Sequence, residues 1–297
     1  MLKHRYFTIS IIAILLVALI GQVYAATSPT LGAADSFSII ANSTITNTGI
    51  TNVSGDVGLV AEPPEDVVDN GTLTVGGTIY VDTDGEAADA MAANTAAFTF
   101  LDQPCGVGVP DWTGDGVTDL VGMSLVPGTY CADAFTLTGT LTLVGDADDV
   151  WIFKSASTLI TSGTANVVGD GICNVWWRVA SSATLGTNTS LLGNILALTD
   201  IHLATGADLF GKAFVQTGEV TLDANTITDA VCVIVQPTAG PRRTATPGTG
   251  LPAFPGTGSG APIFNEVSPW NLLIIGGILA IALFVGSRSL RRNERSK

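Results

Sequence analysis

One stretch of the chain decides the fold. Residues 174–197 read NVWWRVASSATLGTNTSLLGNILA, and its short strand-like segments return in the following residues, up to position 228. Segments that begin at Ala183, Ile201 and Val220 are 18 and 19 residues apart, and the other segments repeat at 18 to 20. Three short strands per 18–20 residues, with turns between them, are typical of one coil of a β-solenoid. We therefore expect a mainly β protein built as such a solenoid.

Strand-like sequence extends outward from this stretch, from Ser36 to Val235, with one interruption. Residues 85–103 are rich in alanine and contain neither glycine nor proline between their ends. Apolar residues recur there at helical spacing, namely Ala90, Ala93, Ala97, Phe98 and Leu101. The pattern predicts one long α-helix over about residues 85–103.

Side chains alternate along each strand, so each of three solenoid faces has an inward and an outward column. On one face both columns are apolar. Phe153 and Trp177 belong to the inward column, whereas Trp176 and Phe214 belong to the outward column. Water cannot be the neighbour of an outward column of this kind, so we expect the helix to pack along this face.

The other two faces carry outward rows of short, mostly uncharged polar residues, about 4.8 Å apart from coil to coil. The first row is expected to contain Thr136, Thr158, Thr184, His202 and Thr221. The second row is expected to contain Thr142, Asn166, Ser190, Asp208 and Thr226. Such rows are compatible with an ordinary threonine-rich strand surface. They are also compatible with a flat, rigid surface that binds a repeating solid such as ice or a polysaccharide, because threonine has a restricted χ1 and loses little entropy on binding.

Several stretches resemble the microbial ice-binding-like family. The similarity is most specific in residues 174–197. It also includes GEVTLDANTIT at 218–228, STITNTG at 43–49, GDVG at 55–58 and PGTYC at 127–131. The resemblance covers roughly residues 31–233. It implies a right-handed β-solenoid flanked by one long helix. It also implies adsorption to ice, which would inhibit ice growth or recrystallisation or attach cells to ice. We expect no enzymatic reaction and no cofactor.

The resemblance also bears on the binding surface. Family members often carry Thr-Ala/Gly-x-Thr/Asn on the binding face, and this chain departs from that pattern in the four-residue stretches that begin at Thr164, Thr187, Thr205 and Asp223. We favour the first row, Thr136, Thr158, Thr184 and Thr221, because it is chemically more uniform. The contact is expected to extend around the shared edge at Thr187 and Thr205. The second row, Thr142, Asn166, Ser190 and Thr226, remains the alternative.

Charge restricts the possible partners. The 297-residue chain has a formal charge of −14, but residues 26–236 contain only 3 basic residues against 24 acidic ones, a net charge of −21. A phosphate-binding basic patch is excluded by this balance, so nucleic acid is not an expected partner. His202 is the one histidine outside the N-terminal leader, which excludes a histidine-cluster metal site. Asp111, Asp115 and Asp119 resemble part of a calcium loop, but Gly122 replaces the bidentate glutamate, so we expect no metal.

The two ends indicate export and attachment. Residues 1–25 read as a secretory signal peptide, with basic residues, an apolar run and small residues before the expected cleavage after Ala25. The solenoid domain is expected over 26–236. A Pro/Gly/Thr-rich stalk follows over 237–268, then an apolar transmembrane helix over 269–287 and a basic cytoplasmic tail over 288–297. This order predicts a cell-surface protein anchored in the cytoplasmic membrane.

Four cysteines in an exported chain suggest two disulfides, for which three pairings are possible. We expect Cys105–Cys131, which brackets the loop after the helix, and Cys173–Cys232, which would tie an insertion between coils to the end of the last strand. The functional hypothesis is a membrane-tethered extracellular ice-binding protein. The alternative is a surface adhesin or structural module of the same fold that binds a glycan or another surface component.

Overall fold

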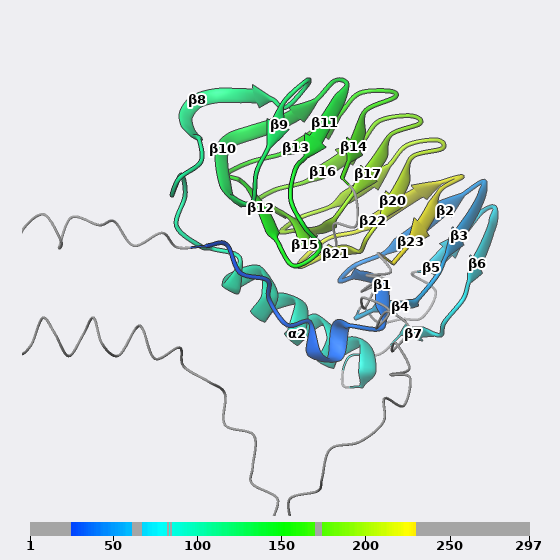
Figure 1. The fold of residues 1–297 in the computed structure, drawn as a ribbon. Coiled ribbons are helices and arrows are strands. Elements are labelled where there is room, and N and C mark those ends of the chain that lie inside the picture. The colour runs from blue at the N-terminus through cyan, green and yellow to red at the C-terminus, as the bar shows by residue number, and fades with distance from the viewer. Residues whose placement is uncertain (1–24, 61–66, 82, 84, 170–173, 230–297) are drawn as a thin grey trace, which may run out of the picture. The chain divides into compact units, whose positions relative to one another are not determined.

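A computed structural model describes residues 25–60, 67–81, 83, 85–169 and 174–229 of the chain (Figure 1). These residues form a right-handed β-solenoid with three strand-lined faces and one long helix, as the sequence predicts. All strand pairs are parallel, because each strand bonds to the equivalent strand of the next coil.

We name the three faces by their strands. The helix face contains β12 (Val150–Ser155), β15 (Asn174–Val179), β18 (Asn194–Ala197), β21 (Ala213–Val215), β1 (Phe37–Ala41), β4 (Asp56–Leu59) and β7 (Ile79–Val81). The first polar face contains β13 (Leu159–Thr161), β16 (Ala183–Leu185), β19 (Ile201–Leu203), β22 (Val220–Asp223), β2 (Ile45–Thr48) and β5 (Val67–Asp69). The second polar face is an eight-stranded sheet of β9 (Ser124–Leu125), β11 (Thr140–Leu143), β14 (Asn166–Val168), β17 (Ser190–Leu192), β20 (Asp208–Phe210), β23 (Thr226–Thr228), β3 (Ile50–Val53) and β6 (Thr72–Val75). Strand β10 (Gly128–Leu137) runs from the helix face onto the first polar face and also pairs with β8 (Asp111–Asp119).

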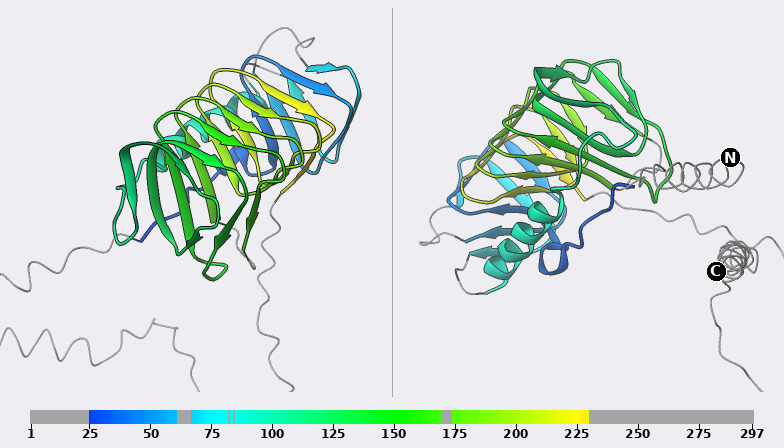
Figure 2. Two further views of the ribbon diagram at one scale, coloured as in Figure 1. Left: turned by 90° about the horizontal axis from the view of Figure 1, so that it is seen from above. Right: turned by 90° about the vertical axis from the view of Figure 1, so that its left-hand side faces the viewer.

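The coils do not stack in the order of the sequence. Strands β1, β2 and β3 pair with β21, β22 and β23 of the last coil, so the N-terminal coils continue the stack that the C-terminal coil ends (Figure 2). The helix α2 (Glu86–Phe100) then leads the chain back along the solenoid to its opposite end, where β8 and β9 lie. The last coil is therefore an interior layer, with neighbours on both sides.

Lys212 joins the two halves at this seam. Its residue is only 8% exposed, and its ammonium group donates hydrogen bonds of 2.7 Å to the backbone oxygens of Asp35 and Phe37. It also lies 3.4 Å from a carboxylate oxygen of Asp229, which accepts a hydrogen bond from Ser38 Oγ. A buried cation therefore satisfies acceptors from both halves of the stack.

The helix covers the helix face, as the sequence predicts. Trp176, Leu196 and Phe214 point outward there and are buried in a cluster with Ala90, Ala97 and Leu101 of the helix segment. Small alanines let the helix approach the sheet closely. Polar contacts fix its position: Asn94 Nδ2 donates to the backbone oxygen of Val215, and Arg178 Nε donates to that of Phe98.

The solenoid interior holds the inward columns. Phe153 and Trp177 stack with ring centroids 4.1 Å apart, and Tyr130 stacks on Phe153 at 5.5 Å. Burial raises the pKa of Tyr130 to about 12, and its hydroxyl donates to the backbone oxygen of Val126. Leucine, isoleucine and valine fill most of the remaining inward positions of both polar faces.

The helix is shorter than expected, 86–100 instead of 85–103. The signal peptide up to residue 24, the stalk, the transmembrane helix at 269–287 and the basic tail lie outside the described residues. Among the helices that the structure describes, none has both the length and the hydrophobicity needed to cross a membrane.

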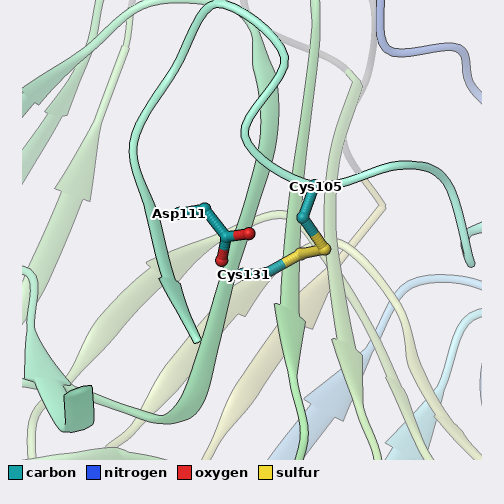
Figure 3. Close-up of side chains that lie close together, drawn as sticks. All are labelled: Cys105, Asp111 and Cys131. Carbon is teal, nitrogen blue, oxygen red and sulfur yellow. A yellow bond between two sulfur atoms is a disulfide. The ribbon is translucent and has the colours of Figure 1, made fainter. Parts of the chain in front are cut away.

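The structure contains the Cys105–Cys131 disulfide, with an S–S distance of 2.06 Å. It connects the segment after α2 to β10 (Figure 3). Cys173 and Cys232 both lie outside the described residues.

We predict that Lys212→Met destabilises the domain by about 2–3 kcal/mol, because two buried backbone oxygens lose their donor. Urea unfolding followed by circular dichroism measures the change. Lys154→Met is the matched control. Lys154 also contacts a backbone oxygen and a carboxylate, but its partner Asp102 is 60% exposed, so a smaller loss is expected. An equal decrease in the free energy of unfolding in both variants would show that Lys212 does not stabilise the junction of the two halves in particular.

We predict that the second disulfide joins Cys173 to Cys232. With Cys105 and Cys131 paired, this is the one intramolecular pairing left to the chain's four cysteines. Peptide mapping without reduction checks it, and such a bond typically contributes about 2–4 kcal/mol. Free thiols at these positions would contradict the prediction.

Candidate functional site

The first polar face differs from the expected row at one position. Strand register aligns Thr136 with Ile160, and Ile160 with Thr184. Ile160 therefore takes the place predicted for Thr158, which lies two residues earlier, before β13 begins. The observed row consists of Thr136, Ile160, Thr184, His202, Thr221, Thr46 and Val68. Its threonines are interrupted by an exposed isoleucine and by an exposed histidine, so it is less uniform than the sequence predicted.

Acidic side chains border this first row. Asp200 and Glu219 immediately precede β19 and β22, and Asp119 pairs with Thr136 at the end of the row. Asp223 ends β22 at the edge shared with the second polar face. The first polar face therefore combines a threonine row with several strongly hydrated carboxylates.

The second polar face also differs from the expected row at one position. Asn166 pairs with Thr140, whereas Thr142 pairs with Val168 and Ser124. The prediction that Thr142 belongs to the row of Asn166 is therefore wrong by two residues along β11. The observed row consists of Thr140, Asn166, Ser190, Asp208, Thr226, Asn52 and Thr74.

A second outward column, which was not predicted from the sequence, runs beside this row. It consists of Ser124, Thr142, Val168, Leu192, Phe210 and Thr228. Val168 is 38% exposed and Phe210 is 44% exposed, so apolar groups face solvent in the middle of the column. Most strands of the second polar face have two outward residues. The residues that lie two positions after Asn166, Ser190 and Asp208 could therefore have been recognised as a second outward column from the sequence.

One charged residue interrupts the row of the second polar face. The carboxylate of Asp208 accepts a 2.9 Å hydrogen bond from the backbone nitrogen of Thr226, in the neighbouring coil. A hydrogen bond to the sheet thus takes the place of some of the water that would otherwise hydrate the Asp208 carboxylate.

The edge between the two polar faces is fixed from inside. Asn225 is buried, and its side-chain nitrogen donates to the backbone oxygens of Ala204 and Ala207 at 2.9 and 2.8 Å. Thr161 and Thr189 share a buried 2.7 Å hydrogen bond between their hydroxyls. These bonds connect one coil to the next, so the edge holds its shape along the stack.

Thr187 and Thr205, the predicted edge contacts, are both exposed at this edge. The hydroxyl of Thr205 donates to the carboxylate of Asp223. Thr205 is therefore less free to contact a ligand than Thr187. Thr164 and Asn188 turn the corner with φ values of 65° and 58°, in the left-handed region.

Two exposed carboxylates have lowered pKa values, and one of them, Asp69, follows Val68 at the end of the first row. A hydrogen bond from Asn47 lowers the pKa of Asp69, and a hydrogen bond from Lys154 lowers that of Asp102. Lowered pKa values in carboxylates contribute stability at neutral pH that is lost on acidification, below about pH 4. Both groups are largely exposed, so the contribution is small.

A cluster near the disulfide has the composition of a metal site but not its chemistry. Asp111 lies beside Cys105 and Cys131 (Figure 3). The two sulfurs are bonded to each other and are not thiolates, which are the form of cysteine that binds metals. Hydrogen bonds from the hydroxyl and the backbone nitrogen of Thr113 occupy Asp111 and lower its pKa. The cluster is therefore part of the loop structure.

Together, the fold and the two rows define a helix-flanked β-solenoid that presents flat, ordered faces to its surroundings. The chain belongs to the ice-binding-like family, whose model matches residues 39–228. An ice-binding protein of Nostoc sp. (strain HG1) is 37% identical over 219 residues, which cover 69% of this chain and 76% of that protein. An ice-binding protein of Flavobacterium frigoris (strain PS1) is 31% identical, with 67% and 75% of the two chains covered. A crystal structure of an ice-binding protein from an Antarctic biological consortium has a TM-score of 0.60 at 32% identity, covering 70% of this chain and 93% of that chain.

Proposed function

We propose that this protein adsorbs to ice through the second polar face and thereby limits ice growth or recrystallisation, or attaches its cell to ice. Support comes from family membership and from relatives that are named ice-binding proteins. The observation that carries the proposal is the pair of parallel columns on the second polar face, one polar and one with an apolar centre, which run side by side along the five strands β11, β14, β17, β20 and β23. This role requires no enzymatic reaction and no cofactor.

Hydration distinguishes the two candidate faces. A surface that adsorbs to ice exchanges its own hydration water for ordered water, so strongly hydrated charges are unfavourable within it. Asp200, Glu219 and His202 lie on or beside the first row. Within the row of the second polar face, Asp208 is the one charged residue, and part of its hydration is already replaced. We therefore assign the site to the second polar face, although the sequence alone favoured the first.

Rigidity supports the same assignment. The backbone of every strand in this face is bonded to its neighbours, and the adjoining edge is fixed by Asn225. Threonine and valine also have restricted χ1 angles, so little side-chain entropy is lost on adsorption. Val168 and Phe210 contribute exposed apolar surface that gains from leaving water.

We further propose that the protein acts outside the cell and is held there by its C-terminal segment. The basis is the sequence pattern of a signal peptide over 1–25, a stalk over 237–268 and an apolar segment over 269–287 followed by basic residues. Solenoid residues 26–236 would then stand away from the membrane.

We predict that Ser190→Tyr abolishes adsorption to ice, whereas Thr184→Tyr leaves most of it. Both side chains point outward from the middle of a row, on the second and the first polar face respectively. A bulky ring at Ser190 would hold the neighbouring coils away from the ice, so that many weak contacts are lost together. Ice-affinity partition measures adsorption, and circular dichroism checks that both variants fold.

Loss of adsorption in Thr184→Tyr alone would show that the first polar face is the site. If both variants adsorb as the wild-type chain does, neither row binds ice. Binding to a surface glycan by a protein of the same fold would then become the better explanation.

We predict that Asp208→Asn strengthens ice recrystallisation inhibition several-fold. The amide oxygen can still accept the hydrogen bond from Thr226, so the sheet keeps its contact while the row loses its charge. The endpoint concentration for inhibition should fall. Asp200→Asn, on the first polar face, is the control and should leave this concentration unchanged. An unchanged value for Asp208→Asn would mean that the row does not touch ice.

A further inference from the structure

The lysine and arginine residues of the folded domain lie on one side of an internal boundary. We call residues 26–103, which contain β1 to β7 and α2, the N-terminal module, and residues 104–229 the C-terminal module (Figure 1). The N-terminal module has 11 acidic residues and neither lysine nor arginine. The C-terminal module has 13 acidic residues and all three cations of the domain, Lys154, Arg178 and Lys212. Both modules are therefore strongly negative, with net charges of −11 and −10.

Each of these three cations donates to backbone oxygens of the N-terminal module. Lys154 Nζ donates to the backbone oxygen of Gln103 at 2.8 Å. Arg178 Nε donates to that of Phe98 at 3.0 Å, and the guanidinium lies 4.3 Å from the centroid of the Phe98 ring. Lys212 donates two such bonds at the junction of the coils. The positive charge of the C-terminal module is thus located where the N-terminal module docks.

The three contacts are spread along the helix face. Lys154 pairs with Arg178 of the next coil, and Lys212 precedes β21, two coils beyond Arg178. The Cys105–Cys131 disulfide adds a covalent connection at one end, since Cys105 lies two residues after the N-terminal module ends. A module that is tethered at one end and bound by cations along its length can separate from the sheet and still remain attached beside it.

Salt acts differently on the two kinds of electrostatic interaction between the modules. Exposed charges interact over about 30 Å at 0.01 M ionic strength, but over about 3 Å at 1 M. Concentrated salt therefore removes most of the repulsion between the two sets of carboxylates, which otherwise opposes the compact state. Buried contacts are screened much less, and the side chains of Lys154 and Lys212 are only 14% and 10% exposed. Salt thus weakens the repulsion and leaves the cation contacts in place.

We propose that ionic strength controls the docking of the N-terminal module. In dilute solution, repulsion between the modules lets the N-terminal module open as a cooperative unit, whereas concentrated salt keeps it docked. Docking joins β1, β2 and β3 to the last coil and covers the apolar column of Trp176, Leu196 and Phe214. Protection of β1 and α2 from solvent is accordingly the property that salt should change.

The same device affects the face to which we assign ice binding. Strands β3 and β6 belong to the N-terminal module and supply Asn52 and Thr74 to the row of the second polar face. Growing ice excludes salt, so the liquid beside it becomes more concentrated. Docking would then be most complete where the row is used. This consequence rests on the proposed function, whereas the docking itself does not.

Hydrogen–deuterium exchange of the full-length chain at two ionic strengths tests the proposal. At about 0.01 M sodium chloride, the amides of β1 and α2 should exchange about tenfold faster than at about 1 M. Amides of β15 and β17, inside the C-terminal module, should change less than about twofold. Calcium chloride at the same ionic strength should give the same protection as sodium chloride, because screening depends on ionic strength and not on a particular cation.

Arg178 provides a matched pair of variants. Arg178→Met removes the charge but keeps an apolar stem, so the salt concentration at which β1 and α2 become protected should rise several-fold. Arg178→Lys keeps the charge and should raise this concentration less. At about 1 M salt, where repulsion is screened, both variants should be as protected as the wild-type protein, which also shows that they fold.

Three results would overturn the proposal. In the first, the two modules respond equally to salt, or neither responds. In the second, Arg178→Met has the same salt dependence as the wild-type protein or as Arg178→Lys. In the third, calcium protects the N-terminal module more strongly than sodium at equal ionic strength, which would identify a specific cation site instead of screening. None of these measurements involves ice, so the docking proposal and the ice-binding proposal can fail separately.

Discussion

Backbone hydrogen bonding between successive parallel coils is the constraint on which the rest of the structure depends. Each strand pairs with the equivalent strand of the next coil, so side chains of the same kind are placed in straight rows about 4.8 Å apart. Such a row can match a regular flat surface only if the stack does not bend. Here the stack is continuous, because the N-terminal coils join the last coil through β1, β2 and β3. Lys212 bonds the two halves at this junction.

The three faces serve different purposes because their outward residues differ. Tryptophan, leucine and phenylalanine on the helix face require an apolar partner, which the alanine-rich helix provides. Acidic side chains beside the first polar face keep it hydrated. The second polar face combines short polar residues with Val168, Leu192 and Phe210, so apolar and uncharged polar groups share that surface. Adsorption to ice is the function that such a surface and the family together support best.

The sequence predicted the fold well because repeating strands and an alanine-rich helix leave a direct periodic signal. The sequence also predicted which side chains point inward. Inward and outward residues alternate along a strand, so an error of two residues in aligning the coils leaves each side chain on the same side of the sheet. The sequence did not predict which residue of a strand joins a given row at the places where the number of residues per coil changes. From Ile160 to Thr184 is 24 residues, against 18 from Thr184 to His202, and this longer coil made Thr158 appear in the place of Ile160. The junction of the first and last coils carries no local signal at all, because it depends on contacts between residues more than 170 positions apart.

Partition of the wild-type full-length chain into slowly growing ice is the most direct measurement of the central claim. A protein that adsorbs through an ordered face should become enriched in the ice fraction, whereas a non-binding protein of similar size and charge stays in the liquid. Enrichment in ice is the result that we predict. Complete retention in the liquid, by a chain that circular dichroism shows to be folded, would contradict the account.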